Sequence, residues 1–285
     1  MTTQYTPYET QPPLPDPEPK RSSATKPLMI VLAVIGGIAL VIAIATTIFS
    51  SALGLSRGSA TLTADASGVT ALDVDANAAQ FTLEFAEVNE AILEASGVSA
   101  ERWELTRSDT TLEVDAPSRW WHWGWFGNNG SSHVTLTLPT ELNDGSLNAD
   151  LDVDAGQLTA TGSFDQLALE LNAGEARVDG AARTLDAQVN AGEATLMIAD
   201  AEETNFEVAA GRLTAELTGS APTTTQIDVS AGQLDLTLPN ETYAVTSDVA
   251  AGNLDNRLDT VSDSQFQIDV DLAAGEAKLH PQSTN

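Results

Sequence analysis

An Ala-Gly dipeptide recurs seven times in the second half of the chain, and the segments around it align without gaps. They read LDVDAGQLTA, LELNAGEARV, AQVNAGEATL, FEVAAGRLTA, IDVSAGQLDL, SDVAAGNLDN and VDLAAGEAKL. Their glycines are separated by 18, 18, 19, 21, 20 and 23 residues. Self-similarity at a nearly fixed period is the sequence signature of a repeat architecture, so the chain is expected to fold by stacking equivalent units.

Apolar residues alternate with polar ones on both sides of each glycine. With the glycine as position 0, positions −3 and −1 are apolar in every copy, and position −1 is always alanine. Position +2 is also apolar in every copy, so the alternation slips by one residue at the glycine. Period-2 alternation is typical of a strand with one buried face, and a bend at the glycine would keep both halves facing one core. The constant alanine then indicates a crowded inner corner that admits only a methyl group.

The pattern predicts an all-β fold, a parallel β-solenoid (β-helix) with coils of about 18–23 residues whose corners stack into a ladder. Upstream, LDVDANAAQF places an asparagine at the glycine position, and asparagine tolerates left-handed backbone well. LEVDAP places Pro117 there. Coils within residues 84–148 are not assigned, and a helical turn in AEVNEAILEAS stays open. The predicted corner ladder comprises Asn77, Gly156, Gly174, Gly192, Gly211, Gly232, Gly252 and Gly275.

Two segments of different composition precede the repeats. Residues 1–27 are proline-rich without apolar periodicity, which predicts a disordered tail. Residues 28–55 carry no charge and are long enough to cross a bilayer as one helix, with a signal peptide cleaved near Ala52 as the alternative. Lys20, Arg21 and Lys26 flank the start of this helix, so the tail is expected in the cytoplasm. We therefore expect a single-pass cell-membrane protein with an extracytoplasmic domain at 60–280.

The charge of the chain is concentrated after the predicted span. Of 41 acids and 12 bases, 38 acids and 9 bases lie beyond residue 55, and the formal net charge is −29. Such a surface repels phosphate backbones and anionic headgroups, which excludes nucleic acid as a partner. Cations and cationic partners stay open, and so does a role of the charge in solubility alone. The chain has no cysteine, which excludes disulfides, thiolate metal sites and cysteine nucleophiles.

Residues 119–132, RWWHWGWFGNNGSS, hold four of the five tryptophans beside Pro117. Insertions leave repeat folds at their loops, so we expect a protruding loop here. Its tryptophans either form a recognition tip for lipid headgroups or a neighbouring membrane protein, or fold back over the open end of the solenoid. The possible interaction residues are Trp120, Trp121, Trp123, Trp125 and Phe126.

Acids recur at alternate positions in Asp150, Asp152 and Asp154, and again in Asp73 and Asp75. On a strand they would share the outward face at a spacing of about 6.5–7 Å. This spacing matches no standard calcium loop, so a solvated acidic face is expected and Ca²⁺ binding is the alternative.

The remaining motifs give no sign of catalysis. His122, His133 and His280 lack metal-ligand spacing, and no GxSxG, HExxH or P-loop pattern occurs. The sequence therefore predicts no enzyme, no catalytic or metal-binding residue and no cofactor.

The strands around VTLTLP (134–139), the Ala-Gly coils, the single span and the proline-rich tail together resemble a known family. This is the bacterial putative-adhesin family of β-strand-repeat domains, which is similar in turn to the toast-rack solenoids of Lia-type envelope-stress proteins. The resemblance covers roughly residues 60–280, and it implies a fold without any catalytic residue.

From these patterns we expect a non-catalytic, adhesin-like module of the bacterial cell envelope that binds a protein or another envelope component. One alternative is a regulatory subunit that senses envelope stress and signals to a kinase partner. The other is a structural spacer.

Overall fold

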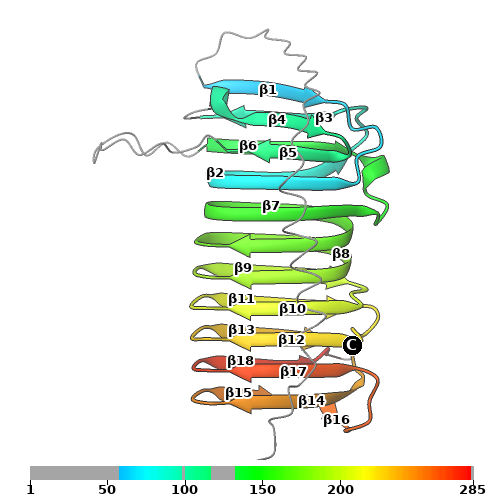
Figure 1. The fold of residues 1–285 in the computed structure, drawn as a ribbon, viewed down its shortest axis with the longest axis vertical. Coiled ribbons are helices and arrows are strands. Elements are labelled where there is room, and N and C mark those ends of the chain that lie inside the picture. Colours follow the sequence, from blue (N-terminus) through cyan, green and yellow to red (C-terminus); the bar gives the residue numbers. More distant parts are fainter. Residues whose placement is uncertain (1–57, 98–99, 117–131, 284–285) are drawn as a thin grey trace, which may run out of the picture. The chain divides into compact units, whose positions relative to one another are not determined.

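The computed structural model describes residues 58–97, 100–116 and 132–283, and the prediction of an all-β fold is confirmed for them (Figure 1). Eighteen strands belong to one large hydrogen-bonded sheet. The described residues hold two short 3-10 turns, η2 (Ala100–Arg102) and η3 (Thr140–Leu142), and no α-helix. The predicted tail (1–27) and membrane helix (28–55) lie outside the described residues. Within the described part, no helix is long and apolar enough to cross a membrane.

The strands range from two to 25 residues in length. They are β1 (Ser59–Ala64), β2 (Ala71–Ala86), β3 (Ala91–Ser96), β4 (Glu104–Ser108), β5 (Thr111–Asp115), β6 (Ser132–Pro139), β7 (Leu147–Leu171), β8 (Gly174–Val189), β9 (Glu193–Ala199), β10 (Glu203–Val208), β11 (Arg212–Thr218), β12 (Thr224–Val229), β13 (Gln233–Leu238), β14 (Thr242–Val249), β15 (Asn253–Asn256), β16 (Asp259–Thr260), β17 (Gln267–Leu272) and β18 (Glu276–Pro281).

The core is built from the alternating apolar side chains of these strands. In β10, for example, Thr204, Phe206 and Val208 are buried and the residues between them are exposed or partly exposed. Most inward leucines and valines are at most 2% exposed. Burial of each such side chain stabilises the fold by about 1.5–3 kcal/mol, so the many repeated inward layers supply stability without disulfides.

Successive copies of the repeat pair in parallel. The strands before the corner form one ladder, in which the second half of β8 pairs with the end of β7 and with β10, and β10 pairs with β12. The strands after the corner form another, in which β8 pairs with β9, β9 with β11 and β11 with β13. In both ladders equivalent positions of the repeat face each other, so the sequence alignment of the copies is also their structural register.

At both ends, the order of strands in the stack differs from their order in the sequence. β17 pairs with β12 on one edge and with β14 on the other, and β18 lies likewise between β13 and β15. The last copy of the repeat therefore lies inside the stack, and the copy around Gly252 lies at its end (Figure 1). At the other end, β2 lies between β7 and the strands β5 and β6.

Antiparallel pairs occur, among the described residues, only near that other end, where β1 pairs with β3, β3 with β6 and β4 with β5. The segment for which a helical turn was open forms strand β3 instead. The reason is its alternation, since Ala91, Leu93 and Ala95 are 0%, 0% and 3% exposed and fill the core between β1 and β6. Trp103, which is 3% exposed, packs against Phe81 at this end.

Candidate functional site

The corner glycines lie directly over one another. A Cβ atom on Gly174 would overlap the carbonyl oxygen of Gly156, and one on Gly232 would lie 2.6 Å from the carbonyl oxygen of Gly211. Real Cβ atoms do not approach other atoms this closely, so a side chain at these positions would push neighbouring copies apart. Close backbone approach therefore explains why glycine recurs in every copy.

The order of the corners in the ladder follows the stack and not the sequence. Gly275 lies against Gly232, and Gly252 lies against Gly275. At the other end Gly156 lies against Ala79, and Asn77, two residues before Ala79, is paired with Ala155 at a break in the register. The structure thus gathers the predicted glycines into one ladder, and it places Asn77 beside that ladder and Ala79 in it.

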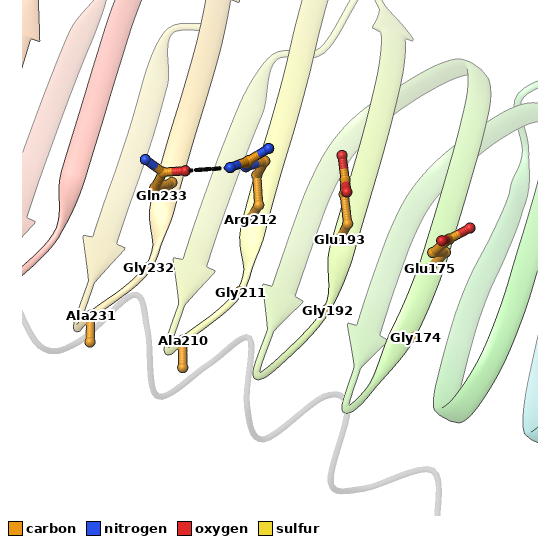
Figure 2. Close-up of a pocket in the computed structure, with 10 residues that line it drawn as sticks. All are labelled: Gly174, Glu175, Gly192, Glu193, Ala210, Gly211, Arg212, Ala231, Gly232 and Gln233. Atoms are coloured by element: carbon orange, nitrogen blue, oxygen red, sulfur yellow. Dashed lines mark hydrogen bonds between the residues drawn. The ribbon is translucent and has the colours of Figure 1, made fainter.

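We expected the alanine that precedes each glycine to fill a crowded inner corner. The structure contradicts this prediction. Ala173, Ala191, Ala231 and Ala274 are all exposed, and Figure 2 shows Ala231 and its neighbour Ala210 pointing away from the strands. The chain turns over positions −2 to 0, so the last inward residue before the corner is at −3 and the next is at +2. Nothing among the described residues explains why this position is always alanine.

A column of amides and one carboxylate joins the first four corners at position −2. Asn77 Nδ2 donates to Asp154 Oδ2 at 3.0 Å, and Asn172 Nδ2 donates to Asp154 Oδ1 at 3.3 Å. Asn190 Nδ2 donates to Asn172 Oδ1 at 2.9 Å. Later copies carry alanine or serine there, and of the seven repeat glycines only Gly156, Gly174 and Gly192 have positive φ. The amide column therefore accompanies the left-handed form of the corner.

An open groove of about 580 Å³ runs along the corners (Figure 2). Its polar side chains are those at position +1 of successive copies: Glu175, Glu193, Arg212 and Gln233. Arg212 donates to Gln233 Oε1 at 2.8 Å, and Gln233 Nε2 donates to Glu276 Oε2 at 3.1 Å. These groups bond to one another along the row and do not converge on a point, an arrangement that suits surface recognition better than catalysis.

The strands before the corner carry a second feature, which we call the acidic face. It consists of the outward side chains at positions −4 and −6 of the first ladder. In stack order, position −4 is occupied by Asp115, Asp75, Asp152, Glu170, Gln188, Glu207, Asp228, Asp271 and Asp248. Position −6 is occupied by Glu113, Asp73, Asp150, Ala168, Asp186, Asn205, Gln226, Asp269 and Thr246.

No lysine or arginine stands among these two columns. Because neighbouring strands are about 4.8 Å apart, carboxylates in adjacent strands repel one another at short range. Partial burial and the negative charge of Glu170, Asp154, Asp75 and Asp150 raise the pKa of Asp152 to about 6. Burial and neighbouring carboxylates likewise raise the pKa of Asp73, Asp75 and Asp150.

One oxygen of Asp152, Oδ1, is buried and makes no hydrogen bond with any described residue. Across the described ranges, no three acidic or histidine side chains are gathered in a way that would hold a metal ion. The acidic face is therefore an extended negative surface with no metal centre in the described part, and the chemistry that it offers is attraction of cationic groups.

Some residues singled out in the sequence lie elsewhere. Residues 117–131, which include Trp120, Trp121, Trp123, Trp125, Phe126 and His122, are outside the described residues. His280 lies on β18 with Nε2 3.4 Å from Asp235 Oδ1, and His133 lies on β6. The acids of the later copies were missed as members of one face. The signal that could have revealed them is an acid at position −4 in six of the seven aligned copies.

Comparison with known proteins finds similar solved structures, several of them at low identity. No family matches the chain, and no curated protein matches it. A putative cell adhesion protein from Clostridium sporogenes is 12% identical with a TM-score of 0.40, covering 79% of this chain and 99% of that one. A putative adhesin from Bacteroides fragilis is 14% identical with a TM-score of 0.46, covering 79% and 98%. A putative lipid binding protein from Parabacteroides distasonis is 13% identical with a TM-score of 0.40, covering 80% and 98%. Likeness at this level says nothing about what this chain binds.

Proposed function

We propose that the chain is a non-catalytic interaction module of the bacterial cell envelope, an adhesin-like β-solenoid held outside the membrane by a span at 28–55 with its tail in the cytoplasm. The observation that carries the proposal is the acidic face, a continuous array of carboxylates presented in one register by eight strands. A rigid repeated surface of one charge sign is suited to binding an extended partner of opposite charge.

The solenoid form is supported by the pairing of the copies. Each copy contributes one strand before the corner and one after it, and both strands pair in parallel with the equivalent strands of its neighbours. The inward side chains of both ladders share one core. A chain that repeats this arrangement has to return to its starting side after every copy, which is the path of a coil.

The absence of catalysis is supported by the way in which polar groups are distributed. The outward side chains follow columns along the stack, and each column repeats one position of the sequence. Acid–base or nucleophilic catalysis needs different groups that converge within about 3 Å of a reacting atom. The acidic face and the groove in Figure 2 have no such convergence, and no cofactor is proposed.

Crosslinking in native membranes tests the proposal. Wild-type chain is compared with a face variant (Asp75→Asn, Asp152→Asn, Asp228→Asn) and with a control that removes as much charge from the strands after the corner, outside the groove (Glu84→Gln, Asp179→Asn, Glu216→Gln). A fourth chain carries serine in place of Trp120, Trp121, Trp123 and Trp125. We expect wild type and control to crosslink the same partner, and the face variant to recover roughly tenfold less of it.

The fourth chain distinguishes the two candidate surfaces, because loss of the partner in that chain alone would assign recognition to residues 119–132. Equal recovery from all four chains, or no specific product from wild type, would contradict the proposal.

A further inference from the structure

The end of the stack formed by β14 and β15 has a strand edge that is largely unpaired among the described residues, and we call it the free edge. β14 pairs with β17 along Ala244–Val249, and β15 pairs with β18 along Asn253–Asn256 (Figure 1). On the opposite edge, the described residues provide only β16, which pairs with Thr242 and Tyr243. The opposite end of the stack differs, because the antiparallel strands β1, β3 and β4 lie along its edges.

The backbone groups on this edge can be assigned from two hydrogen bonds of opposite direction. Ala244 N–H donates to Phe266 O at 2.8 Å, toward β17, and Tyr243 O accepts from Val261 N–H at 2.9 Å, away from β17. Successive residues of a strand point their backbone groups to alternate edges. The N–H and C=O groups of Val245, Ser247 and Val249 therefore face away from β17, where no described strand meets them.

The core layer at this edge is also open. Val249 is 40% exposed, whereas Val229 at the same position of the repeat is 0% exposed. Ser247 is exposed and Val245 is only partly buried, whereas their partners in β17, Val270 and Ile268, are 0% and 1% exposed. One additional strand in the same register would cover these side chains and satisfy the free backbone groups at once.

The column of carboxylates at position −4 ends at this edge, and it determines which charge an added strand should carry. A strand that places apolar residues over Val245 and Val249 places its alternate side chains on the outer surface, because side chains alternate between faces. There it would lie about 4.8 Å from Asp248, the last carboxylate of position −4. Like charges opposite each other in a sheet are destabilising and opposite charges are stabilising.

We propose that the free edge of β14 and β15 takes up an extended segment of another protein as an added β-strand, with basic residues alternating with apolar ones. The residues around this edge also favour a basic partner. Residues 240–263 hold five acids and a single base, Arg257, which is paired with Asp255. A second copy of this chain is a poor occupant, because its own repeats present an acid or glutamine at position −4. The inference goes beyond the proposed function: it uses Asp248 at the end of the acidic face, and it requires neither a membrane anchor nor a partner bound along the rest of that face.

The test uses the full chain in detergent micelles and a short peptide in which lysine and valine alternate, with a peptide of the same composition in two blocks as the control. Hydrogen exchange locates the bound peptide. We expect the alternating peptide to slow exchange at the amides of Val245, Ser247 and Val249 and the block peptide to leave them unchanged.

Ser247→Pro removes one outward N–H and leaves the hydrogen bonds to β17 in place. It should weaken binding of the alternating peptide by roughly tenfold.

Charge variants provide the second measurement. Asp248→Lys should weaken binding of the alternating peptide by roughly tenfold. Asp179→Lys, the same change on an exposed residue of β8, should leave its binding unchanged. Protection confined to acidic-face strands other than β14, or equal binding of both peptides, would mean simple charge attraction and overturn the inference. Protection of the same amides by raising the protein concentration without peptide would assign the edge to a second copy and overturn it as well. The crosslinking experiment above can succeed or fail independently of either result.

Discussion

At the scale of single residues, the corner glycines decide whether copies can stack. Gly174 combines two demands, a φ of +117° and a backbone oxygen of Gly156 where a Cβ would stand. Gly68 also has a positive φ, of +70°, but no atom lies within 4 Å of the place where its Cβ would stand. The two positions separate the conformational strain of an alanine from its clash with the neighbouring copy.

Gly174→Ala should lower the free energy of unfolding by about 2–4 kcal/mol, because strain and displacement of the neighbouring backbone add. Gly68→Ala should lower it by about 1 kcal/mol, from strain alone. Chemical denaturation of both variants, followed by circular dichroism, measures the difference. Equal destabilisation by the two substitutions would show that the corners do not press against each other.

At the scale of strands, the acidic face sets like charges side by side within one ladder. The folded state raises the pKa of Asp152 from an ordinary value of 3.8 to about 6, so it favours the protonated form more than the unfolded chain does. The contribution of Asp152 to stability is therefore most favourable below about pH 4, and it is lost as pH rises toward about pH 6. Asp144 has the opposite shift, because hydrogen bonds from Ser146 lower its pKa.

Asp152→Asn should raise the free energy of unfolding at pH 7.5 by about 1–2 kcal/mol, a range reduced for solvent screening. It should also flatten the loss of stability between pH 4 and pH 6. Asp144→Asn should lower stability at pH 7.5, since it removes a carboxylate that the fold stabilises. Thermal or urea unfolding across this pH range measures both. A wild-type stability that rises from pH 4 to pH 6 in step with Asp152 ionisation would contradict the assigned cost of ionising a partly buried Asp152 beside other carboxylates.

The strands themselves could be predicted from sequence because their alternation is local. The placement of the constant alanine was not, because the alternation was counted up to the glycine, whereas the turn already begins at position −2. The register of the first copy was ambiguous because Val74 and Ala76 are both apolar, so two alignments shifted by two residues fit equally well. Asp150 and Asp152 were expected on an outward face. Their continuation into Glu170 and Glu207 depends on which copies are neighbours.

At the scale of the whole stack, strand register alone does not determine the order of the copies. β14 and β12 meet β17 in the same register, so backbone pairing would allow either the copy around Gly252 or the copy around Gly275 to follow the copy around Gly232. The copy around Gly252 has polar Ser247 and Asn256 where the copy around Gly275 has Val270 and Leu279, and this difference favours the end position for the former. The structure places the copy around Gly275 next to the copy around Gly232. This exchange leaves β14 and β15 with the free edge, and it ends the column of carboxylates at Asp248.

Disulfide formation between introduced cysteines tests the stacking of the corners most directly, because the chain has no cysteine of its own. A disulfide needs Cα atoms about 4.4–6.8 Å apart, which one step of the stack satisfies and two steps, at about 9.6 Å, do not. The exposed alanines Ala210, Ala231, Ala251 and Ala274 provide the positions. We predict rapid intramolecular disulfides in Ala210→Cys with Ala231→Cys and in Ala231→Cys with Ala274→Cys, and none in Ala231→Cys with Ala251→Cys. A disulfide in the last pair and none in the second would contradict the proposed order, and failure of all three would contradict the stacked corners themselves.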